Sequence, residues 1–124
     1  MNRRQLWGFI AIMAVVLVAG GLLWRHHQQT VASIQLQSRE ATAGKELFAG
    51  LCETCHGPGG DGAGGAPILN DGSVLKTYTS PSSLSAFIQT HMPASNPGML
   101  NSQEATDLAL YIFELNHQFP PAHG

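Results

Sequence analysis

The most prominent hydrophobic feature of the chain is a continuous apolar run near its N-terminus. From Leu6 to Trp24 the sequence LWGFIAIMAVVLVAGGLLW contains 19 residues and no charged or amide side chain. At 1.5 Å per residue, a helix of this length extends about 28 Å, which matches the hydrocarbon core of a bilayer. We therefore expect residues 1–25 to form a single transmembrane anchor.

The residues that flank the apolar run predict its orientation. Arg3 and Arg4 precede it, Arg25 follows it, and Trp7 and Trp24 lie at its ends, where indole rings prefer the membrane interface. The excess of positive charge before the run places the N-terminus in the cytoplasm. The rest of the chain is then expected on the periplasmic or extracytoplasmic side of the cytoplasmic membrane.

A cleaved signal peptide is the alternative reading of the same run. The small residues Ala19, Gly20 and Gly21 lie near its end. The run is, however, longer than the usual apolar region of about 7–15 residues, and it lacks an A-x-A cleavage pattern. These observations favour a retained anchor.

After the apolar run the pattern becomes polar and irregular. Residues 26–40 are rich in Gln and Ser with isolated apolar positions, which predicts a flexible tether or a frayed extension of the membrane helix. His26 and His27 lie next to the membrane and are most simply solvated residues of the interface.

Three later segments place apolar residues at helical spacing. They cover residues 43–51 after a Thr42 N-cap, residues 81–90 with Ser80 as cap, and residues 101–116 with Asn101 as cap and a Glu three positions later. No alternating strand pattern of useful length appears. The sequence predicts an all-α domain in which a glycine-rich loop, residues 57–79, joins the first two of these helices.

Composition restricts the function of this domain. The chain has six Lys plus Arg and eight Asp plus Glu among 124 residues, with no basic cluster, so nucleic-acid binding is not expected. From Glu40 onward there are only two lysines against eight acidic residues, a net charge of −6. Complementarity then predicts a basic or largely apolar docking surface on a partner.

The two cysteines of the chain belong to one motif. Cys52, Cys55 and His56 form C-x-x-C-H, the attachment signature of haem c, in which two thiols on one helical turn bind the porphyrin and the next residue supplies an imidazole to iron. A thioredoxin-like redox pair expects a βαβ context that is absent. A zinc site needs further ligands, and a disulfide between these positions is strained. Haem also completes the core of a domain too small to be stable alone.

With its surroundings, the motif resembles the class I monohaem cytochromes c. The resemblance covers residues 41–116 and rests on AGKELF before CETCH, on APIL after it and on LALYI in the last helix. It implies the class I fold over residues 41–118, followed by a tail, residues 119–124. It also implies that the helix carrying Gly44 and Phe48 crosses the helix carrying Leu108 and Tyr111.

The resemblance extends to the surroundings of the haem. It implies that the Pro67 carbonyl accepts a hydrogen bond from Nδ1 of His56 and that Leu69 packs on the ring. Two methionines and a histidine compete for the second axial position. Met92, in the sequence HMP, is preferred because a residue before proline leaves the helical region. Met99 is the first alternative and His91, on the apolar face of residues 81–90, is the second.

With both axial positions filled, no open site remains for a small-molecule substrate. The resemblance therefore implies an electron carrier rather than an enzyme, working in a respiratory or related chain. Its partners would be redox proteins such as a membrane dehydrogenase, a quinol oxidoreductase or a terminal oxidase. The alternatives are a haem-carrying subunit of a larger membrane oxidoreductase and, less favoured, a gas sensor or peroxidase, for which the sequence offers no acid–base pair.

Overall fold

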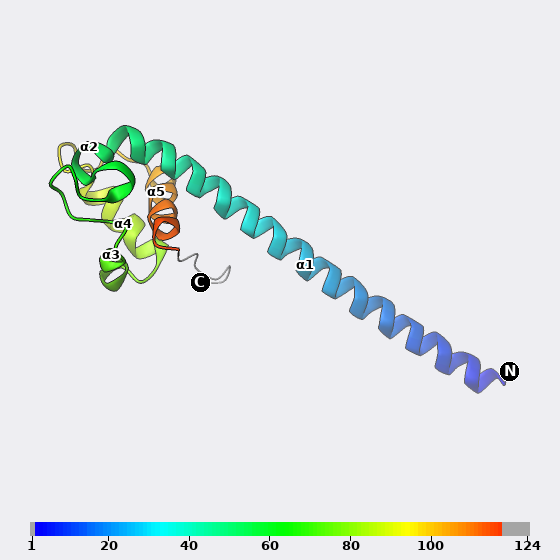
Figure 1. Cartoon of the computed structure of the whole chain (residues 1–124). Helices are drawn as coiled ribbons and strands as arrows, with labels where there is room; N and C mark the ends of the chain where they lie inside the picture. Colours follow the sequence, from blue (N-terminus) through cyan, green and yellow to red (C-terminus); the bar gives the residue numbers. More distant parts are fainter. Residues whose placement is uncertain (1, 118–124) are drawn as a thin grey trace. The chain divides into compact units, whose positions relative to one another are not determined.

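The computed structural model describes residues 2–117, which belong to two compact units divided after Ile34. Helix α1, Arg3–Leu51, contributes residues to both units (Figure 1). The expected tail, residues 119–124, lies outside the described residues.

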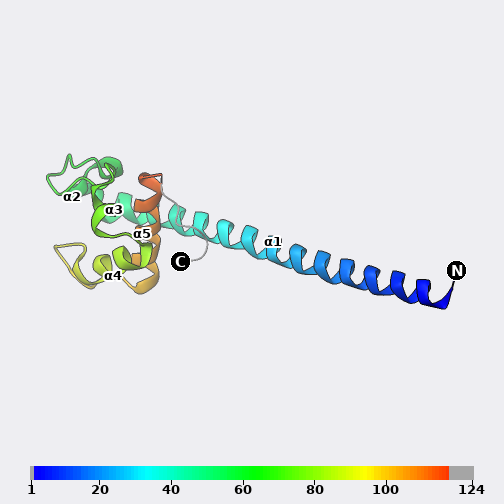
Figure 2. The same ribbon diagram turned by 90° about the horizontal axis from the view of Figure 1, so that it is seen from below.

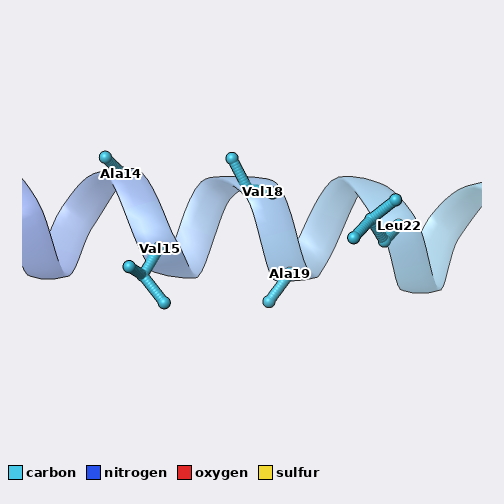
Figure 3. Close-up of a pocket in the computed structure, with 5 residues that line it drawn as sticks. All are labelled: Ala14, Val15, Val18, Ala19 and Leu22. Atoms are coloured by element: carbon cyan, nitrogen blue, oxygen red, sulfur yellow. The ribbon is translucent and has the colours of Figure 1, made fainter.

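The first unit is the apolar part of α1. Its large apolar side chains, including Val15 and Leu22, are exposed along the helix. By length and composition, α1 is long and apolar enough to cross a membrane. Figure 3 shows the apolar side chains of Ala14, Val15, Val18, Ala19 and Leu22 projecting from the helical backbone. Exposed apolar area of this extent is costly in water and favourable in lipid.

Residues 26–40, for which a flexible tether or a helical extension was expected, are helical throughout. The predicted N-cap at Thr42 is wrong, because Thr42 lies inside α1 and its hydroxyl donates a hydrogen bond to the Ser38 carbonyl at 2.8 Å. The physical reason is that no Gly or Pro interrupts the chain between Gly21 and Gly44, while Gln, Ala, Leu and Arg favour helix. A polar composition alone does not end a helix.

The second unit is helical in every regular element that the described residues contain. After the end of α1 come α2 (Glu53–His56), a 3₁₀ turn η1 (Pro58–Gly60), α3 (Ser73–Thr77), α4 (Pro81–His91) and α5 (Ser102–Leu115). This arrangement confirms the all-α prediction, and the helix near residues 81–90 and the last helix begin where they were expected. Helix α3 and η1 lie within the segment expected as a glycine-rich loop.

The N-terminal caps of α4 and α5 explain those helix starts. The Ser80 hydroxyl accepts a hydrogen bond from Ser83 N, and Pro81 follows it in the first turn. Asn101 Oδ1 accepts from Gln103 N and Glu104 N, while Glu104 Oε2 accepts from Asn101 N at 2.9 Å. Both caps satisfy helical N–H groups that would otherwise have no partner.

The core of the second unit is built mainly on α4 and α5, which lie side by side (Figure 1, Figure 2). Ser85 and Thr106 also join them through a hydroxyl hydrogen bond of 3.2 Å. The buried core residues are Phe48, Leu84, Ile88, Leu100, Ala105, Leu108, Ala109, Tyr111, Ile112 and Phe113.

The last part of α1 crosses α5 at Gly44. A Cβ placed on Gly44 would collide with the Asp107 carbonyl oxygen and would lie 2.9 Å from Tyr111 Cβ. Next to this crossing the rings of Phe48 and Tyr111 meet edge to face, with centroids 5.4 Å apart. The crossing implied by the resemblance is therefore present.

Candidate functional site

The C-x-x-C-H motif occupies the junction of α1 and α2. Cys52 follows the last residue of α1, and Cys55 and His56 form the end of α2. The Cys52 carbonyl accepts hydrogen bonds from Cys55 N at 3.1 Å and from His56 N at 2.8 Å. This tight turn places the two cysteines at helical i, i+3 positions, which lie on the same side of a helix.

The two thiols differ in their environment. Both are free; Cys52 is half-buried and Cys55 is exposed. Burial, with smaller contributions from Cys55 and from the Glu53 carboxylate, raises the pKa of Cys52 to about 11. A thioredoxin-like redox pair expects a βαβ context, and the regular elements described within residues 2–117 are all helical.

A zinc site finds no support in the described part of the chain either. Within residues 2–117, no three His, Cys, Asp or Glu side chains gather closely enough to hold a metal ion. A structural zinc site usually has four such ligands. Within these residues, the imidazole and the two thiols of the motif therefore do not form a group of metal ligands with another His, Cys, Asp or Glu side chain.

The imidazole of His56 has a defined hydrogen-bond partner. Its Nδ1 lies 2.8 Å from the Pro67 carbonyl oxygen, as the sequence resemblance implied. Because a carbonyl can only accept, Nδ1 carries the proton, and in the neutral imidazole Nε2 then has the free lone pair. A histidine in this tautomer is oriented and made more basic for binding a metal through Nε2.

Main-chain hydrogen bonds hold the loop that supplies Pro67. Ala66 N donates to the Cys55 carbonyl at 2.9 Å, and Leu69 N donates to the Gly60 carbonyl at 2.8 Å. The turn after His56 needs Gly57, whose φ of +79° is disfavoured for other residues and whose added Cβ would meet the Asp61 carboxylate. The glycine-rich segment is thus an ordered loop folded back onto the motif.

Partly buried apolar side chains extend the core toward the motif. They are Leu47, Leu51, Cys52, Leu69, Val74, Leu75, Tyr78, Met92 and Leu115, a set that includes the predicted site residues Leu69 and Met92. A planar apolar group can complete the burial of such side chains. Two thiols, one imidazole with a free Nε2, a thioether and this apolar border together fit haem c.

The three candidates for the second axial ligand have different environments. Met92 leaves α4 with φ −119° and ψ +150°, the expected extended conformation, and it packs against the core. Met99 is 48% exposed. His91 was expected on the apolar face of its helix, but it is exposed, stacks on Phe87 at 4.6 Å and has Nδ1 2.7 Å from the Thr90 hydroxyl. Burial favours Met92.

Sequence reasoning missed the contribution of Asn116 to this region. Asn116 follows the last residue of α5, and its side chain makes hydrogen bonds to the loop at Leu69 and Gly72. The available signal was a side-chain amide at the end of an apolar helical stripe, which is typical of a helix cap. Its remote partners, more than 40 positions away, leave no mark in the local sequence.

Comparison with known proteins identifies the family of the second unit. A family model described as cytochrome c oxidase, cbb3-type, subunit III matches residues 39–112. A thiosulfate dehydrogenase of Psychrobacter arcticus (strain DSM 17307 / VKM B-2377 / 273-4) is 38% identical over 85 residues, which cover 58% of this chain and 25% of that protein. The chain thus spans about a quarter of that relative's length, and no solved structure matches. Since the matched family covers more than half of the sequence and includes the C-x-x-C-H motif, this chain belongs to the c-type cytochrome family of the cbb3-type oxidase subunit III.

Proposed function

We propose that this electron-transfer cytochrome is a membrane-anchored monohaem cytochrome c that exchanges single electrons with redox proteins outside the cytoplasmic membrane. In this proposal Cys52 and Cys55 would hold one covalent haem, and His56 and Met92 would bind its iron. The observation that carries the proposal is the 2.8 Å contact of His56 Nδ1 with the Pro67 carbonyl beside two free thiols.

When bound, haem supplies the Fe(II)/Fe(III) couple that carries one electron. The residues of the chain then have separate tasks. Pro67 fixes the tautomer of His56, so that Nε2 is the donor atom. Leu69 and Tyr78 cover apolar area and limit the access of water. Occupation of the second axial position by Met92 would leave no coordination site for a substrate, which favours electron transfer over catalysis.

A second candidate is a haem-carrying subunit of a larger membrane oxidoreductase. The description of the matched family as an oxidase subunit favours it, and the similarity to part of a thiosulfate dehydrogenase is compatible with it. A stoichiometric subunit would remain with its partners during purification in mild detergent. A free carrier would purify alone, so analysis of the native complex separates the two candidates.

The anchor is proposed from α1, whose apolar residues are exposed in the first unit. The full chain should resist extraction of membranes with alkaline carbonate. Protease added to the outside of spheroplasts should digest the haem domain, and the intact mass should include residues 1–25. Release of the protein by carbonate, or a mass lacking these residues, would contradict a retained anchor.

The central experiment is spectroscopy of the full chain produced with a cytochrome c maturation system. The wild type should carry haem that survives denaturing electrophoresis and should show a low-spin His/Met spectrum. Met92→Ala should lose that spectrum and bind CO in the ferrous state, while the matched control Met99→Ala should retain it. A His/Met spectrum that persists in Met92→Ala would refute this ligand, and absence of covalent haem in the wild type would refute the function.

A further inference from the structure

Asn116 connects the end of α5 to the loop that carries Pro67. Its Nδ2 donates to the Leu69 carbonyl at 2.8 Å and to the Ile112 carbonyl at 2.7 Å, and its Oδ1 accepts from Gly72 N at 2.7 Å. Asn116 is half-buried. One side-chain amide is therefore hydrogen-bonded to two remote main-chain groups and to one carbonyl of its own helix.

The contacts of Asn116 with Leu69 and Gly72 hold the loop on the far side of Pro67, in addition to the hydrogen bond from Leu69 N to the Gly60 carbonyl. On the near side the loop is fixed by the hydrogen bond from Ala66 N to the Cys55 carbonyl. Pro67 has no N–H group with which to hold its own position. The segment that accepts the proton of His56 Nδ1 is therefore fixed at both ends, and Asn116 provides the only side-chain hydrogen bonds to Leu69 and Gly72 found within residues 2–117.

We propose that Asn116 is a positioning residue for the haem site: by holding Leu69 and Gly72 against α5, it keeps the Pro67 carbonyl on Nδ1 of His56. This inference rests on the proposed function, because His56 acts there as the proximal ligand. A firm Nδ1 hydrogen bond increases the basicity of the imidazole, and a more basic ligand stabilises the ferric state. Loosening the loop should shift the equilibrium toward the ferrous state.

The alternative is that Asn116 only terminates α5 through its bond to Ile112. Two variants of the same helix separate these roles. Asn116→Leu has nearly the same shape and removes all three hydrogen bonds. Asn101→Ala removes the cap at the opposite end of α5 without touching the loop. Both variants should be less stable, but only the first should alter the environment of His56.

The experiment uses the full, haem-loaded chain and measures three quantities. These are the covalent haem content, the midpoint potential and the ¹H and ¹⁵N shifts of His56 Nδ1 in the diamagnetic ferrous protein. We expect Asn116→Leu to keep its haem and to favour the ferrous form about threefold. At 59 mV for each tenfold change in a one-electron couple, this corresponds to a rise of about 28 mV. The Nδ1 proton should move upfield, as a weaker hydrogen bond requires.

Wild-type values of potential and Nδ1 shift in Asn116→Leu would overturn the inference. An equal change in Asn101→Ala would also overturn it, because the effect would then follow the stability of α5. In both cases the proposed function still stands if the wild type carries covalent haem. If the wild type carries none, the proposed function itself is refuted.

A measurement on the wild type covers the case in which Asn116→Leu does not accumulate. The Gly72 amide proton should exchange with solvent clearly more slowly than a free amide, because Asn116 accepts its hydrogen bond. Exchange of Gly72 N–H at the rate of a free amide would overturn the proposal.

Discussion

Gly44 of α1 lies directly against the main-chain carbonyl of Asp107 in α5, with no room for a side chain between them. The neighbouring Phe48 and Tyr111 rings pack edge to face across the same junction. The two helices thus approach each other at a residue without a side chain. The need for so small a residue at position 44 can be tested by substitution.

Gly44→Ala should destabilise the haem domain by about 3 kcal/mol, because rigid main chain must move to admit one methyl group. Gly50→Ala is a matched control on the same helix, since nothing lies within 4 Å of its added Cβ. It should leave stability unchanged or raise it by up to about 1 kcal/mol. Denaturant unfolding followed by circular dichroism measures both. Similar stability of the two variants would contradict the close crossing.

Removal of the cysteines should act in steps. Cys52→Ala or Cys55→Ala alone should leave one thioether, and haem should still migrate with the protein during denaturing electrophoresis. The double variant should lose covalent haem completely. Haem staining and intact mass measure the outcome. Covalent haem in the double variant would show that other groups hold it.

The acidic character of residues 40–117 should be visible in electron-transfer kinetics. With two lysines against eight acidic side chains, a small cationic reductant should react more slowly as salt is added, and an anionic reductant should react faster. Stopped-flow measurements between about 10 mM and 0.5 M salt test this, since the Debye length falls from roughly 30 Å to a few Å. Rates that do not change with salt for either reagent would rule out charge steering.

Tyr111 should make stability fall at alkaline pH. Burial, followed by the Glu53 and Glu114 carboxylates, raises the pKa of Tyr111. The unfolded phenol ionises near pH 10. The stabilising contribution of the neutral phenol is therefore complete below about pH 10 and is lost as pH rises through the folded-state pKa.

The matched variant for this effect is Tyr111→Phe, which cannot ionise. Above about pH 10 the wild type should lose unfolding free energy relative to the variant, by at most about 1.4 kcal/mol for each pH unit. Denaturant titrations at several pH values measure it. A constant difference across this range would show that Tyr111 ionises equally in both states.

Local signals predicted much of the fold. Ser80 and Asn101 cap α4 and α5 as expected, because N-terminal capping depends on residues within one helical turn. The Thr42 cap was wrong for the converse reason: a good capping residue does not start a helix when helix-forming residues already precede it.

For the candidate site, the structure contains one contact that was expected before it. The C-x-x-C-H spacing identifies Cys52, Cys55 and His56 locally, and the family resemblance implied the contact of His56 with Pro67, which is present. Asn116 could not be found in this way, because its importance depends on which distant carbonyl and amide groups the fold brings to it. Helix α3 was also missed, since five residues between glycine-rich and turn-forming segments carry little periodicity.

The hydrogen-bond acceptor for His56 is a main-chain oxygen, and this has a genetic consequence. No single substitution at position 67 can delete a peptide carbonyl, so a side-chain change there alters the contact only through the backbone freedom that loss of the proline ring allows. While His56 is kept, mutations change this contact only by moving the backbone, through loop residues or through groups that hold the loop. Natural variation in the tuning of this imidazole should therefore arise in the loop itself and at remote positions, such as Asn116, that hold it.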